Sequence, residues 1–284
     1  MIQTLRHIRN RLRSIGNVKK ITQAMEMVSS SRLNKIKNTF YSSHQHFLNL
    51  EYIVKRLLAD LKNVSHPLMG NVTEPKRTAV CIISSDTGLC GTYNHNVITT
   101  AEMFLKKYPA GALKLITVGK EAFTYFERHG YKVAHSHLAL YGRYSPKFSG
   151  DLSREIIGMF LKKEADQAFI VYTHLCTKLR HASVVEKFLG IECAGTGERR
   201  YILEPDENRI LDILIPKYLG AKMNDILLDA LTSENSARML AMKTATDNAK
   251  ELITTLTLMR NKARQAAITK EVVEIAMSAE ALKG

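Results

Sequence analysis

Residues 242–266 read MKTATDNAKELITTLTLMRNKARQA, and this stretch decides the fold of the chain. Apolar or small side chains recur in it at alternating intervals of three and four residues, the spacing of a coiled-coil seam. The predicted seam positions are Met242, Ala245, Ala249, Leu252, Leu256, Met259, Ala263 and Ala266. No Gly or Pro lies between Gly220 and Gly284, so a helix here could extend on the order of 90 Å at about 1.5 Å per residue. A helix of that length needs a second helix against its seam.

The N-terminal region supplies that second helix. No Gly or Pro interrupts the chain between Gly16 and Pro67, and apolar residues follow a helical spacing. The seam residues are Leu5, Ile8, Leu12 and Ile15, followed by Val18, Ile21, Met25 and Val28. The step from Ile15 to Val18 is three residues where four would keep the heptad, which predicts a stammer. One long helix enters the middle of the chain and the other leaves it, so we expect an antiparallel pair with a single-helix tip of about a dozen residues, or very roughly 20 Å.

The middle of the chain alternates short β-rich runs with amphipathic helical segments. Strands are expected at Thr78–Ser84, Leu113–Val118, Tyr131–His135 and Ala168–His174, with a further short one at Tyr201–Leu203. Helices are expected at Asn94–Tyr108, Lys120–His129 and Leu152–Lys163. This alternation predicts a Rossmann-like α/β domain with a mostly parallel sheet. With Pro216 and Gly220 at the entry to the last helix, the expected boundaries are 1–66 for the first coiled-coil helix, 67–212 for the α/β domain and 213–284 for the last helix.

Composition and charge restrict the function classes. The chain has 284 residues, 45% of them hydrophobic and 7% aromatic, which suits one globular domain with an elongated element. Its formal net charge is +14, which suits nucleic acid, an acidic protein or an anionic membrane surface. Four cysteines show no Cys-x-x-Cys pair, so neither a disulfide scaffold nor a zinc module is expected. The first residues carry no apolar signal core and no window is apolar enough to span a bilayer, so we expect a soluble or peripheral protein.

No catalytic, cofactor or metal site is predicted. The Asp86–Gly91 loop lies where an α/β domain binds phosphate, but it lacks the Gly-Lys-Ser/Thr ending and is better explained as a tight turn. His135 and His137 alternate on a predicted strand, and His44 is near His46, yet neither pair has a third ligand at a recognisable spacing. As a nucleophile, Cys90 or Ser84 would need a base that the sequence does not position.

Four segments carry a resemblance to a known family. They are KITQAMEMV with SSSRL at 20–33, SSDTGLCG at 84–91, ARMLAMKTATDNA at 237–249 and NKARQAAIT at 261–269. Together they closely resemble the gamma subunit of F-type ATP synthase, and the match covers both long helices and the middle domain. One departure is Ser278-Ala279, where the family pattern has Gly-Ala.

The resemblance implies a non-catalytic central rotor. The coiled coil would insert into a ring of alpha and beta subunits, and the α/β domain would form a foot with the epsilon subunit on the membrane ring of c subunits. Met25, Arg264 and Gln265 match positions that face the alpha–beta ring, and Tyr201 and Glu204 match the segment near the c ring. No cofactor is implied, and the implied location is the cytoplasmic face of a bacterial plasma membrane.

Two alternatives remain open on the residues alone. A nucleic-acid-binding coiled-coil protein would show a steep salt dependence of duplex affinity. A nucleotide-dependent α/β enzyme would turn over its substrate as a single purified chain.

Overall fold

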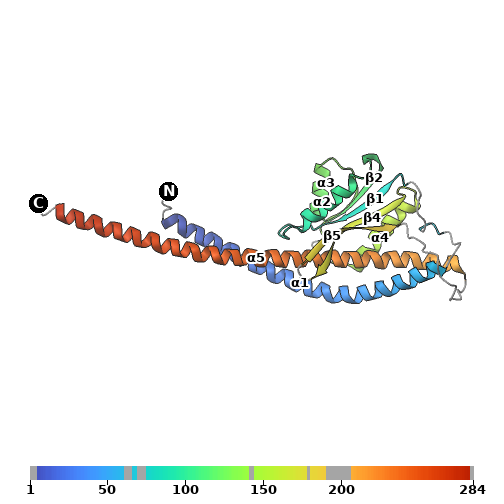
Figure 1. The fold of residues 1–284 in the computed structure, drawn as a ribbon, viewed down its shortest axis with the longest axis horizontal. Helices are drawn as coiled ribbons and strands as arrows, with labels where there is room; N and C mark the ends of the chain where they lie inside the picture. The colour runs from blue at the N-terminus through green and yellow to red at the C-terminus, as the bar shows by residue number, and fades with distance from the viewer. Residues whose placement is uncertain are drawn as a thin grey trace. The chain divides into compact units, whose positions relative to one another are not determined.

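The computed structural model of the protein describes residues 5–60, 66–68, 75–140, 144–177, 180–189 and 206–281. The chain begins with a long helix and ends with a longer one, and an α/β region lies between them in the sequence (Figure 1). The elements in chain order are α1 (Leu5–Asp60), β1 (Thr78–Ile83), α2 (Tyr93–Leu105), the 3-10 turn η1 (Ala110–Ala112), β2 (Leu113–Val118), α3 (Lys120–Arg128), β3 (Val133–His137), α4 (Pro146–Leu161), β4 (Gln167–Thr177), β5 (Arg180–Leu189) and α5 (Glu207–Ala281).

The chain divides into two compact units. One is Ser29–Arg238, and the other combines Met1–Val28 with Met239–Gly284. The first unit holds a five-stranded sheet in the order β3-β2-β1-β4-β5. Its first four strands are parallel to their neighbours, and β5 is antiparallel to β4. The mostly parallel sheet is confirmed, while β5 was not predicted.

Helices cover both faces of this sheet. On one face α2 and α3 bury Val97, Ala101 and Phe126 against strand residues such as Val80 and Leu115. On the other face α4 packs together with the parts of α1 and α5 that belong to this unit (Figure 1). The two long helices therefore belong to the core of the α/β unit, with Leu58, Leu211 and Leu219 almost completely buried.

Most predicted element boundaries of the α/β region hold to within a few residues. The β3 strand begins at Val133, two residues later than expected, and α4 begins at Pro146, six residues earlier. Proline suits this first helical turn because its missing N–H has no partner there in any case. The expected strand at Tyr201–Leu203 lies outside the described residues.

The last helix begins earlier than the sequence suggested. Pro216 and Gly220 were expected at its entry, with a boundary at residue 213, but α5 begins at Glu207 and both residues lie within it. A proline inside a helix costs about 3 kcal/mol. Pro216 is on the exposed side of α5, while Ile215 and Leu219 beside it are fully buried in the core, and their burial offsets that cost.

Within the Ser29–Arg238 unit, α1 and α5 are antiparallel, as predicted. The Nδ1 atom of His44 lies 2.9 Å from an Asp225 carboxylate oxygen. The rings of Phe47 and Tyr218 stack with centroids 6.0 Å apart. Residue numbers thus rise along one helix as they fall along the other.

The second unit contains what we call the terminal helix pair, α1 residues 5–28 and α5 residues 239–281. Its α5 seam differs from the predicted one at every second position. Met242, Ala249 and Leu256 are buried as expected. Leu252 and Met259, however, are 51% and 48% exposed. The intervening seam positions are one residue later, at Thr246, Ile253, Arg260 and Ala267.

The α1 seam also differs, because the predicted stammer is absent. Burial continues at unbroken intervals of four and three through polar residues. These positions are Ile15, Lys19, Thr22, Glu26 and Ser29. The apolar residues that suggested the stammer, Val18, Ile21 and Val28, are each about half exposed. Counting apolar residues therefore gave the right face up to Ile15 and wrong positions at Val18, Ile21 and Val28.

Two threonine hydroxyls meet in the observed register. Thr246 is 3% exposed and its hydroxyl donates to the Thr22 hydroxyl at an oxygen–oxygen distance of 2.8 Å. Thr22 in turn donates to the Lys19 carbonyl at 3.1 Å. The Thr246 hydroxyl also lies 2.8 Å from the Met242 carbonyl oxygen, so each hydroxyl has an acceptor on its own helix and is satisfied in the buried seam.

A matched pair of leucine substitutions tests this seam. We expect Leu256→Ala, at a buried seam position, to destabilise the protein by about 2–5 kcal/mol. Leu252→Ala, four residues away and half exposed, should change stability by no more than about 0.5 kcal/mol. Urea unfolding followed by helical circular dichroism measures both variants, and equal losses of stability would restore the predicted seam.

Candidate functional site

The terminal helix pair presents apolar side chains to its outside. On α1 and α5 these residues are between 38% and 62% exposed, and they lie on segments whose seams bury threonine and serine. They are Val18, Ile21, Met27, Val28, Leu240, Leu252, Leu258 and Met259. Exposed apolar side chains gathered in this way are typical of a surface that a partner covers.

The C-terminal tip of α5, residues 268–281, is exposed at every described position. Ile268, Val272 and Ile275 are spaced by four and three residues, so they form one apolar stripe on the helix. The last half-buried residue before the tip is Ala267. At about 1.5 Å per residue the tip is roughly 20 Å long, as the sequence predicted.

The described α1 segment of the pair is strongly basic. Its charged residues are Arg6, Arg9, Arg11, Arg13, Lys19 and Lys20 against Glu26. All the basic ones except Lys19 are exposed. The exposed positive charge favours a partner with an acidic surface.

The structure locates three of the five predicted contact residues. Met25 is half-buried beside the seam residues Thr22 and Glu26. Arg264 and Gln265 are adjacent and exposed on α5, and among the described residues neither side chain has a hydrogen-bond or ionic partner. Tyr201 and Glu204 lie outside the described residues.

A second place to look for a site is the carboxyl end of the parallel strands, where open α/β sheets bind ligands. There the N-terminus of α3 already has protein acceptors. The Ser84 hydroxyl accepts from the Ala122 N–H at 3.0 Å, and an Asp86 carboxylate oxygen accepts from the Lys120 N–H at 3.1 Å. A Cβ at Gly119 would lie 2.3 Å from the Ser84 carbonyl oxygen, so this close approach needs glycine. The donors that would hold a phosphate are occupied.

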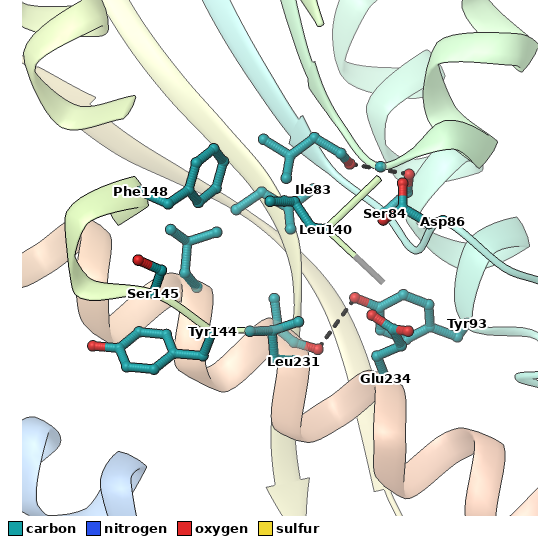
Figure 2. A pocket seen from close by; sticks show the side chains of 14 residues that line it. Ile83, Ser84, Asp86, Tyr93, Leu140, Tyr144, Ser145, Phe148, Leu231 and Glu234 are labelled. Atoms are coloured by element: carbon teal, nitrogen blue, oxygen red, sulfur yellow. Dashed lines mark hydrogen bonds between the residues drawn. The ribbon is translucent and has the colours of Figure 1, made fainter. Parts of the chain in front are cut away.

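The cavity beside these residues is small and mostly apolar. Ile83, Leu140, Phe148 and Leu231 gather around it, with Tyr93 and Glu234 at one side (Figure 2). It offers about 20 Å³ of space for the centre of a water molecule, room for about one water. The Tyr93 hydroxyl donates to the Ala230 carbonyl on α5 at 3.2 Å. A nucleotide does not fit this cavity as it stands.

The Asp86–Gly91 loop contacts α5 through Arg238, a contact that the sequence analysis missed. The Arg238 Nη2 atom lies 2.9 Å from the Thr87 carbonyl oxygen, and Nη1 lies 2.7 Å from a Glu234 carboxylate oxygen. The sequence signal that could have indicated this contact is the pair of opposite charges, Glu234 and Arg238, four residues apart on one helix. Burial raises the pKa of Glu234, and the Arg238 charge opposes that rise.

The side chains that the sequence analysis weighed as a nucleophile or as metal ligands are engaged in contacts within the fold. Burial raises the pKa of the Cys90 thiol, which keeps it protonated at neutral pH. His135 and His137 both contact Glu155 of α4, with nitrogen–oxygen distances of 3.0 and 2.8 Å. No group of three or more His, Cys, Asp or Glu that could hold a metal occurs within the described residues. No helix of that part of the chain has an apolar stretch long enough to cross a membrane.

Comparisons with known proteins agree over nearly the whole chain. Residues 4–282 match the sequence profile of the ATP synthase family. The ATP synthase gamma chain of Protochlamydia amoebophila is 36% identical over 288 residues, and that of Pelotomaculum thermopropionicum is 37% identical over 284. Each alignment covers 99% of both proteins.

Solved structures share the fold at low sequence identity. A chain of the OSCP/F1/c-ring structure of Euglena gracilis mitochondrial ATP synthase matches with a TM-score of 0.73 and 19% identity, over 98% of this chain and 94% of that one. A chain of the rotor structure from the same organism matches with a TM-score of 0.67 and 19% identity, over 93% of this chain and 98% of that one. With the sequence relatives and the matching profile, the conclusion is that the chain belongs to the ATP synthase gamma chain family.

Proposed function

We propose that the chain is the central rotor subunit of an F-type ATP synthase, a shaft with no catalytic site of its own. In this role it couples ion flow through the membrane ring to ATP synthesis or hydrolysis by the alpha and beta subunits. The observation that carries the proposal is the terminal helix pair. Its seam buries polar threonines while apolar side chains face outward, which suits a helix pair enclosed by other subunits.

The proposed partners are the alpha and beta subunits, the epsilon subunit and the ring of c subunits, without nucleic acid. Met25, Arg264 and Gln265 are assigned to the alpha–beta ring, and their exposure or partial exposure on the terminal helix pair supports this assignment. Tyr201 and Glu204 are assigned to the foot near the c ring and epsilon. The domain division into 1–66, 67–212 and 213–284 belongs to the same proposal.

We assign the protein to the cytoplasmic face of a bacterial plasma membrane, as a peripheral part of the complex. The support is that relatives with 36% and 37% identity come from the bacteria Protochlamydia and Pelotomaculum.

Co-purification tests the proposed function directly. The chain, co-expressed with the alpha and beta subunits of the same complex and tagged on one partner, should be recovered in a stoichiometric assembly that hydrolyses ATP. The purified single chain should show no ATP turnover. Recovery of the alpha–beta assembly without this chain, or ATP turnover by the chain alone, would contradict the proposal.

Met25→Lys tests the alpha–beta contact on α1. The new ammonium must be hydrated or paired at a half-buried position, and an acceptor on the enclosing ring would add friction to rotation. We expect ATP hydrolysis to persist while ion transport per ATP hydrolysed falls. Both rates are measured in membrane vesicles, with Met25→Leu as the size-matched control. Equal ion transport per ATP in the parent and Met25→Lys would remove Met25 from the contact.

Arg264→Ala combined with Gln265→Ala tests the contact on α5. A charged hydrogen bond is worth about 1.5–3 kcal/mol, strong enough to favour one orientation and weak enough to break at each step. We expect lower steady-state ATP turnover with unchanged assembly yield. The control is Asp247→Ala with Lys250→Ala, an exposed ion pair of 2.8 Å on the same helix. Parental turnover in the Arg264 and Gln265 double variant would make these two residues ordinary surface.

A further inference from the structure

Two segments far apart in the sequence meet at the guanidinium of Arg238. Besides the Glu234 carboxylate and the Thr87 carbonyl, this group reaches the Thr87 hydroxyl at 3.2 Å and the Gly88 carbonyl at 3.4 Å. The side chains of Arg238 and Glu234 are 7% and 6% exposed. We call Arg238, Glu234 and the Thr87–Gly88 backbone the arginine clamp. It joins α5 to the loop that follows β1.

The loop side of the clamp is fastened to the sheet unit. The Ser85 N–H donates to the Asn94 side-chain oxygen at 3.1 Å, and the Ser85 hydroxyl donates to the Thr87 carbonyl at 2.7 Å. Asp86 accepts from the backbone N–H groups of Lys120 and Ala139. A force on the Thr87 carbonyl is therefore passed to α2, α3 and the chain after β3.

Three polar fastenings that join α5 to the sheet unit, the clamp among them, are spaced along the helix. Lys222 contacts Glu186 at 2.8 Å and donates to the Lys187 carbonyl at 2.7 Å. Asp229 contacts His174 and accepts from the Leu175 N–H at 3.1 Å. Arg238 follows nine residues later and is the last residue of the unit. The three fastenings extend over about 24 Å of helix.

This spacing suits resistance to twisting. A buried guanidinium with several fixed acceptors has one geometry, because its planar donors match those acceptors in only one rotation of the helix. Buried ion pairs of this kind serve specificity of geometry more than stability, because desolvation offsets their attraction. A helix that only needed anchoring could use apolar contacts here, as it does at Leu219 and Leu227.

We propose that the arginine clamp is the joint through which torque passes between the sheet domain and α5, with Arg238 as the positioning residue. The inference rests on the proposed rotor function and deepens it. After Arg238, α5 continues without interruption to Ala281. Torque applied at the clamp therefore acts on one continuous helix. Without the clamp, only the shared apolar core and the remaining polar contacts resist twisting of α5 against the sheet domain under load.

The test compares Arg238→Met, Arg238→Lys and the parent in the complete membrane-bound complex. The control is Arg154→Met, which removes an exposed arginine paired with Asp151 on α4. In membrane vesicles, ion transport per ATP hydrolysed is measured with and without an opposing ion gradient, and the assembled complex is quantified. We expect Arg238→Met to keep ATP hydrolysis and lose most of its ion transport per ATP against the gradient.

Arg238→Lys separates torque transfer from stability. Lysine can keep the charge beside Glu234 but cannot bind both loop carbonyls and the carboxylate, so it should assemble nearly as the parent does and still lose transport under load. A purely structural role predicts lower yield with parental transport per ATP in the assembled fraction. That result for either variant overturns the proposal.

If Arg238→Met does not assemble, Arg238→Lys decides alone, with reduced transport supporting the clamp and parental transport refuting it. If the parent chain does not assemble with the alpha and beta subunits, the proposed function has failed instead.

Discussion

The surface of the terminal helix pair depends on a register in which the buried hydroxyls of Thr22 and Thr246 meet. With these two hydroxyls 2.8 Å apart in the seam, Val18 and Ile21 on α1 and Leu252 on α5 have to face outward. The pair therefore buries Thr22 and Thr246 together with Met242, Ala249 and Leu256, and leaves other apolar groups at its surface. In water alone the exposed apolar groups add nothing to the hydrophobic stabilisation of the pair. Other subunits packed around the pair would supply the missing burial.

The Ser29–Arg238 unit is built on the opposite principle. There α1 and α5 place Leu58, Leu211 and Leu219 in a core shared with the sheet, and polar contacts such as those of Lys222 and Asp229 also join α5 to the sheet. The same two helices thus change from a self-sufficient core to a surface that needs partners. The carboxyl end of the sheet is also closed by α5, through Tyr93 and Arg238. In this fold the usual ligand position has become a structural contact.

The sequence predicted the architecture because that depends on strong periodic signals. Long runs without Gly or Pro predicted both long helices, and the alternation of strand and helix patterns predicted the mostly parallel sheet. The seams were harder, because positions three and four residues apart both lie near one helix face. The pattern favoured apolar Leu252 and Met259 as seam residues, whereas the structure has Thr246, Ile253 and Arg260 at the intervening seam positions. The strand β5 was missed because RHASVVEKFL has only a weak alternation, and it pairs with β4 over its length.

The candidate site was predictable only in part. Exposure of Arg264 and Gln265 follows from their position next to the seam residue Ala263, and the structure agrees. The buried partners of Arg238 could not be read from the chain, because the Thr87 carbonyl lies 151 residues away in sequence and offers only its backbone. Tyr201 and Glu204 stay predictions.

Hydrogen exchange of the terminal helix pair tests the central claim most directly. Amide exchange in residues 5–28 and 239–281 should be faster in the isolated chain, because two helices alone leave much of their apolar surface exposed, and strongly slowed in the complex with alpha and beta subunits. The core strands β1 and β4 serve as the internal reference, with slow exchange in both states. Equal protection of the helix pair in the isolated chain and in the complex would contradict the account.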